Sequence, residues 1–188
     1  MKRTTRLTAG LVATAALAAP SALAAAQAAA PTTTVKAQTK QLLKDIAGKD
    51  KRLARLSTSN AVQRLADDTE GEVVSNVTDA RTALADLRST VEAADSTVDT
   101  RAARKDLRSF RVENFRIVVN VLKKVEGLEE AAAADPEAVA HLAAAESGAL
   151  EITATSTKAD IRAVREHVQA AQAELETETE TEPEPATS

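Results

Sequence analysis

The strongest limit on the fold of this chain comes from two heptad runs, in which apolar and small residues recur at alternating intervals of four and three positions. Such spacing draws a narrow stripe along one side of an α-helix, and that stripe is buried when it packs against another helix. The first run comprises Val73, Val77, Ala80, Leu84, Leu87, Val91, Ala94 and Val98. The second comprises Leu150, Ala154, Thr157, Ile161, Val164, Val168, Ala171 and Leu175. Both runs predict helices that pack side by side.

Residues that end helices are scarce between these runs and around them. Of the five prolines, only Pro136 lies between residues 32 and 182. Asp135 and Pro136 together form a good helix start, with a capping side chain followed by proline in the first turn. We therefore predict an all-α domain over residues 29–175, folded as an elongated antiparallel bundle of about four helices with coiled-coil-like heptad seams. The helices are expected at about 33–66, 72–98, 101–126 and 136–175.

Three details of these helices are less regular. The stretch 33–66 has a drifting apolar face, and either 48–50 or 57–60 is a candidate interruption. The stretch 101–126 carries two adjacent apolar lines, which suits a central helix that contacts several neighbours. Asn114 falls within one line, either as a buried polar residue that sets register or as a residue leaning toward the edge. The stretch 136–175 is expected to kink near Gly148.

The first residues of the chain have the pattern of a secretory signal peptide. A basic start at 1–6 precedes thirteen apolar or small residues at 7–19 and a series of alanines. A spanning helix needs about 20 apolar residues, so cleavage is favoured over a membrane anchor. We predict a signal peptide over 1–28, cut after Ala28 or, alternatively, after Ala24. No cysteine is present to carry a lipid anchor or a disulfide. The expected product is secreted and has no membrane span.

Charge alternates along the chain in blocks. Residues 36–64 and 100–125 each have a net charge of +6, whereas residues 65–99 have −7. One interpretation is that neighbouring helices of opposite sign fix their pairing in the bundle. The other is that the second basic block binds an external polyanion such as a wall polymer or anionic lipid headgroups. The candidate binding residues are Arg101, Arg104, Lys105, Arg108 and Arg111.

The carboxyl end has a different composition. Residues 176–188 alternate glutamate with threonine and proline, and alanine is their one hydrophobic residue. Such a segment cannot bury enough apolar surface to offset the entropy lost on ordering. We predict a disordered acidic tail that serves solubility.

Residues suited to catalysis or cofactor binding are few. His141 and His167 are 26 positions apart, too far for one helix to bring both to one metal ion. No recognised catalytic, phosphate-binding or zinc-binding motif occurs. The two phenylalanines are the only aromatic side chains of the Phe, Tyr and Trp class, so base stacking on nucleic acid is not expected. We predict no enzyme activity, metal or cofactor, with a carboxylate-based hydrolase as a minor alternative.

The stretch 101–125 (RAARKDLRSFRVENFRIVVNVLKKV), together with the leader and heptad helices, resembles a group of small exported helical proteins of actinobacteria. That resemblance implies an exported helical protein and, because the group has no established activity, no particular site. The expected function is non-enzymatic: an interaction or structural component of the cell envelope or extracellular space. We also expect self-association through the heptad faces, because a single seam buries little surface.

Overall fold

The computed structural model describes residues 30–180, with side chains from 34 to 177. Within these residues the chain is helical and contains no strand, which confirms the prediction of an all-α fold. The helices are α1 (Ala30–Ser57), α2 (Asp67–Glu92), α3 (Thr97–Ser109), α4 (Glu113–Ala132), α5 (Pro136–Leu150) and α6 (Lys158–Glu180). None of the helices in this part of the chain combines the length and apolarity needed to cross a membrane.

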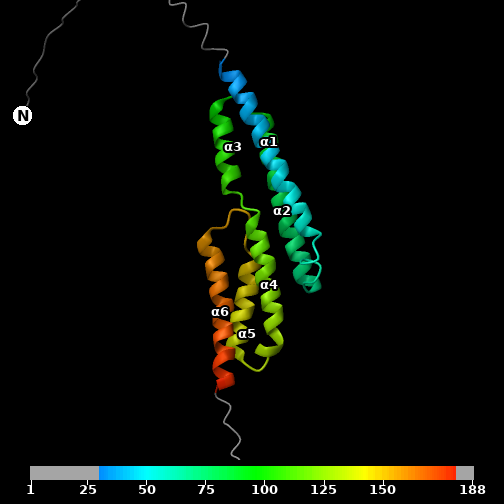
Figure 1. The fold of residues 1–188 in the computed structure, drawn as a ribbon, viewed down its shortest axis with the longest axis vertical. Coiled ribbons are helices and arrows are strands. Elements are labelled where there is room, and N and C mark those ends of the chain that lie inside the picture. Colours follow the sequence, from blue (N-terminus) through cyan, green and yellow to red (C-terminus); the bar gives the residue numbers. More distant parts are fainter. Residues whose placement is uncertain (1–29, 181–188) are drawn as a thin grey trace, which may run out of the picture.

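The helices form two groups along an elongated molecule (Figure 1). In the first group α1 and α2 make an antiparallel hairpin, and α3 packs against both. In the second group α4, α5 and α6 pack against one another. Helices α3 and α4 follow each other in the same direction, so that the chain passes from one group to the other between them (Figure 1). Helix α2 also contacts α4 and α5, which joins the groups.

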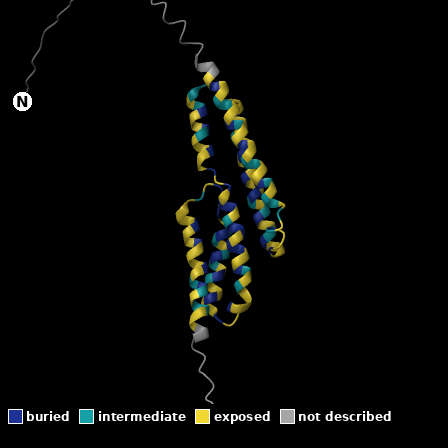
Figure 2. Ribbon diagram, in the orientation of Figure 1, coloured by how far each residue is buried: buried dark blue, intermediate teal, exposed yellow. Residues whose placement is uncertain are grey.

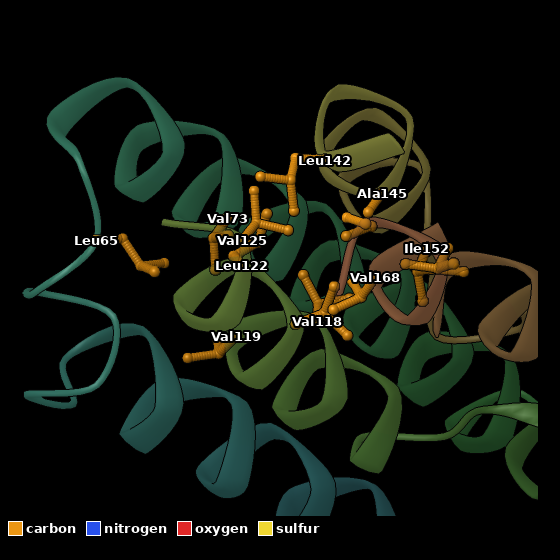
Figure 3. Close-up of a cluster of buried hydrophobic side chains, with 14 of the residues drawn as sticks. Leu65, Val73, Val118, Val119, Leu122, Val125, Leu142, Ala145, Ile152 and Val168 are labelled. Atoms are coloured by element: carbon orange, nitrogen blue, oxygen red, sulfur yellow. The ribbon is translucent and has the colours of Figure 1, made fainter. Parts of the chain in front are cut away.

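The buried side chains form two clusters, one centred on each group, and the buried faces of the helices point inward (Figure 2). The cluster named here the α1–α3 core also takes in the start of α4 and one residue of the 151–157 connection. It consists of Leu42, Ile46, Leu53, Val77, Ala80, Leu84, Val91, Ala103, Leu107, Phe110, Val112, Phe115 and Ala154. The other, the α4–α6 core, also takes in Val73 of α2 and two residues of the connection between α1 and α2 (Figure 3). It consists of Val62, Leu65, Val73, Val118, Val119, Val121, Leu122, Val125, Ala132, Ala138, Leu142, Ala145, Ala149, Ile152, Ile161, Val164, Val168 and Ala171. Leu56 packs against both clusters.

The first heptad run is buried over most of its length. Val73, Val77, Leu84 and Val91 are each at most 1% exposed. The prediction is wrong at its end, because α2 stops at Glu92 and Val98, in the first turn of α3, is 67% exposed. Ser96 starts the new helix by capping it, which ends the continuity that the spacing suggested.

The expected helix 101–126 is two helices. Phe110 has an extended backbone, with φ −76° and ψ 108°, and separates α3 from α4. The break lets both Phe110 and Val112 enter the α1–α3 core, where they are 6% and 3% exposed. The pair spans more of the chain than predicted, from Thr97 to Ala132.

The expected helix 136–175 is a hairpin. Asp135 caps α5, and Pro136 lies in its first turn as predicted. The chain then leaves the helix after Leu150, crosses a seven-residue connection and returns as α6, which packs against α5. Thr157 starts α6: its hydroxyl accepts from the Asp160 backbone N–H, and its own N–H donates to the Asp160 carboxylate at 2.7 Å. This local cap, together with the burial of Ile152 and Ala154, ends the helix that heptad spacing had extended.

The two unexpected breaks lie against each other. The Arg111 N–H donates to the Ala154 carbonyl at 2.7 Å. The amide nitrogen of Asn114 donates to the carbonyls of Thr153 at 2.8 Å and Ser156 at 3.1 Å. Each connection therefore satisfies polar backbone groups that the other leaves outside a helix.

Helices α1 and α6 both end at residues other than those predicted. Helix α1 ends at Ser57, within the candidate interruption 57–60, and not at residue 66. Helix α6 continues to Glu180, so that residues 176–180 are helical where a disordered tail was predicted. The signal peptide, its cleavage at Ala28 or Ala24 and residues 181–188 lie outside the described residues.

Candidate functional site

A groove between α1 and α3 contains two of the five residues predicted to bind a polyanion. Its volume is about 460 Å³, and its floor includes the buried side chains of Leu42 and Leu107. The polar residues of its walls are Gln41, Asp45, Lys49, Arg104 and Arg108. Three cations and one carboxylate thus give this groove, called the basic groove below, a positive charge.

Helix α3 is held firmly where it forms one wall. Ser96 and Asp99 make a capping box: the Ser96 hydroxyl accepts from the Asp99 N–H, and the Asp99 carboxylate accepts from the Ser96 N–H, both at 3.2 Å. The hydrogen bond from the Ser96 hydroxyl lowers the pKa of Asp99 below its ordinary value of 3.8. An ionised carboxylate in the first turn also suits the positive end of the helix dipole.

A buried contact ties α3 to α1. Thr100 is fully buried, and its hydroxyl donates to the Gln38 side-chain oxygen at 2.6 Å. One turn later Ala103 and then Leu107 enter the α1–α3 core. Because these residues fix the inward face of α3, the arginines at 104 and 108 are placed along the opening between the two helices.

Lys49 is the residue of this groove that sequence reasoning missed. It is half-buried, its ammonium group donates to the Phe110 carbonyl, and it lies 5.8 Å from the centre of the Phe110 ring. Burial lowers the pKa of Lys49, while nearby Glu113 acts in the opposite direction. A signal existed: Leu42, Ile46, Lys49 and Leu53 follow the heptad intervals, so that a lysine occupies a seam position.

The five predicted residues are divided by the structure. Arg104 and Arg108 line the basic groove, and Arg104 is half-buried there. Arg101 and Lys105 are exposed on α3, while Arg111 is exposed in the connection between α3 and α4. The described part of the chain has three ion pairs, and none of them includes any of these five cations. Their role in binding a polyanion stays a prediction.

Charge pairing between helices differs from the block pattern. The two ion pairs that join different helices are Arg52–Glu113 at 3.2 Å and Arg81–Asp50 at 2.7 Å. The second pair joins an arginine of the acidic block to an aspartate of the basic block, the reverse of the expected signs. The basic side chains of α3 are therefore left without close carboxylate partners among the residues with described side chains.

Two other hollows each contain a single carboxylate. A groove of about 550 Å³ between α1 and α2 contains Asp50, which is already paired with Arg81. A smaller hollow of about 260 Å³ lies over the two breaks and contains Asp79 as its one carboxylate. Across residues 34–177 no set of three side chains of the His, Cys, Asp or Glu type could hold a metal ion. His141 and His167, however, come together because α5 and α6 form a hairpin, which sequence reasoning did not foresee.

The capped and tethered α3 thus presents a row of cations beside α1. Comparison of the chain with protein-family models, with curated proteins and with solved structures finds no match.

Proposed function

We propose that this chain is an exported, non-enzymatic interaction protein of the cell envelope or extracellular space, and that its basic groove binds an anionic polymer. The observation that carries the proposal is the row of cations formed by half-buried Arg104 and exposed Arg108, neither of which is paired with a carboxylate among the described side chains. Lys49 adds a third positive charge from the opposite wall. Fixed cations of this kind attract a polyanion without first giving up an internal ion pair.

The form of the groove favours a linear polymer over a lipid surface. Two rod-like helices bound it, and its lining runs along them from Gln41 to Lys49 on α1 and from Arg104 to Arg108 on α3. Phosphate or carboxylate groups spaced along a chain can follow such a furrow. Charge-assisted hydrogen bonds from the guanidinium groups suit either anion.

The proposal also states that the protein is exported and is not an enzyme. The leader at 1–28 supports export. Each of the three hollows described above holds a single carboxylate, whereas a glycosidase-like reaction needs a facing pair. Self-association stays a prediction, but most members of both heptad runs are buried inside the chain, so a second copy would need another surface.

Binding to inorganic polyphosphate at several salt concentrations tests this function. We expect the full chain to bind, with an affinity that falls steeply as salt rises, because binding releases counterions from the polymer. Replacing Arg104, Lys105 and Arg108 by Ala should weaken binding by about tenfold or more at low salt. The reason is that each exposed charge contact contributes under about 1 kcal/mol to the free energy of binding. The salt dependence should become shallower at the same time.

The matched control removes three other cations. Lys158, Arg162 and Arg165 are exposed on α6, away from the groove, and their replacement by Ala changes the net charge equally. This control should bind polyphosphate almost as the unchanged chain does. An equal loss of polyphosphate binding in both triple variants would mean that only the net charge matters, and would contradict specific binding in the basic groove. Binding to anionic vesicles but not to polyphosphate would contradict the proposal that the ligand is a polymer.

A further inference from the structure

Two histidines from different helices of the α4–α6 group lie side by side. His141 of α5 and His167 of α6 have ring centres 5.8 Å apart, and their ring planes are inclined by 37°. Neither imidazole takes part in a hydrogen bond or ion pair with another described side chain or backbone group. His167 is exposed and His141 half-buried, so the pair is open to solutes.

The distance between the rings fits two ligands of one metal ion. An imidazole that binds through nitrogen at about 2.0–2.1 Å holds its ring centre about 3.2 Å from the ion, so two such centres lie at most about 6.4 Å apart. The observed 5.8 Å is within this limit. Because His167 is exposed, its ring is able to rotate toward the ion.

The helices that carry the two rings are packed closely. Ala138 and Ala145 flank His141 along α5, Ala171 follows His167 on α6, and all three alanines have no exposed surface. Near the connection, a Cβ atom built on Gly148 would lie 3.1 Å from a methyl group of Val164. Small residues thus let α5 and α6 approach, and this close packing fixes the two backbones that carry the histidines.

We propose that His141 and His167 bind one divalent first-row transition metal ion between α5 and α6. Imidazole nitrogen suits copper, zinc and nickel, and affinity should follow the general order in which copper exceeds zinc. No third histidine or carboxylate among the described side chains completes the site, so water or an external ligand occupies the remaining positions. This site is separate from the basic groove and does not depend on the function proposed for it.

Titration of the full chain, without an affinity tag, with Zn²⁺ tests the site. We expect one saturable ion per chain and a rise in melting temperature when zinc is added, because the ion joins two helices of the folded state. Each of the single variants His141→Ala and His167→Ala should bind zinc about 10- to 100-fold more weakly than the unchanged chain. The reason is that the second imidazole binds at the high effective concentration of an intramolecular ligand.

A relocated histidine is the matched control. The double variant His167→Ala with Glu166→His keeps two histidines but moves one to the neighbouring exposed position, about 100° around α6. It should bind zinc no better than the single variant His167→Ala, while its helical circular dichroism matches that of the unchanged chain. Equal zinc affinity in all these variants would overturn the site. So would the lack of saturable binding by the unchanged chain, which would leave the two rings as a packing contact.

Discussion

Asn114 lies buried at the start of α4, in the turn that follows the break between α3 and α4. Its side-chain nitrogen donates to the carbonyls of Thr153 and Ser156, and its own backbone N–H donates to the carbonyl of Arg111. A single amide thus joins the α3–α4 connection to the α5–α6 connection. Asn114 is 2% exposed, so water cannot easily replace its side chain.

Replacing Asn114 by Ala should lower the free energy of unfolding by about 1–3 kcal/mol, because two carbonyls lose their donor in a poorly hydrated place. Urea denaturation measures the change. Asn120 of α4 is exposed, and its replacement by Ala is the control, with an expected change within about 0.5 kcal/mol. Equal effects at both positions would mean that the contacts of Asn114 contribute no stability.

The sequence left two alternatives for Asn114, a buried residue in the seam or one at its edge. Burial confirms the first location, but the hydrogen bonds go to a connection and not to a polar residue of a neighbouring helix. That partner could not be predicted, because 151–157 was expected to be helical. Lys49, by contrast, could have been noticed as a lysine in a heptad position.

At the scale of helices, the apolar spacing predicted which residues are helical more accurately than it predicted where each helix ends. Leu150 and Ala154 keep the heptad interval through a segment that is not helical, because the connection also buries Ile152 and Ala154. The burial pattern alone therefore cannot distinguish one continuous helix from two helices joined by a buried connection. Local capping can: a Ser or Thr with Asp three residues later starts α3 at Ser96 and α6 at Thr157.

The capping box of α3 should be measurable. Replacing Ser96 by Ala should reduce stability by about 1 kcal/mol at neutral pH. The folded pKa of Asp99 is lowered, so its contribution is present above the unfolded value near 3.8 and is lost as pH falls through the lower folded value. The difference between the unchanged chain and Ser96→Ala in urea denaturation should therefore shrink below pH 4. A difference that grows in acid would contradict this assignment.

The whole molecule has two cores and several links between them. Helix α4 contributes Phe115 to the α1–α3 core and Val118 to the α4–α6 core, and the 151–157 connection is divided in the same way by Ile152 and Ala154. Neither heptad run indicated this division, because each predicts a stripe on one helix without naming the helix that covers it. Which helices pack against one another could be learned only from the structure.

Two matched substitutions test how far the cores are independent. Val77 and Val125 are 0% and 2% exposed, one in each core, and replacing either by Ala removes two methyl groups at a cost of about 2 kcal/mol. Native-state hydrogen exchange should show that Val77→Ala speeds exchange mainly in α1–α3. Val125→Ala should act mainly on α4–α6. Equal acceleration of all helices by both variants would indicate a single cooperative unit.

The described chain starts and finishes at opposite poles of its long axis (Figure 1). The basic groove belongs to the half that contains the start of α1, and Glu180 ends the other half. A molecule lying against a polymer through α1 and α3 would therefore be polarised: whatever follows residue 180 begins on the side remote from the attachment.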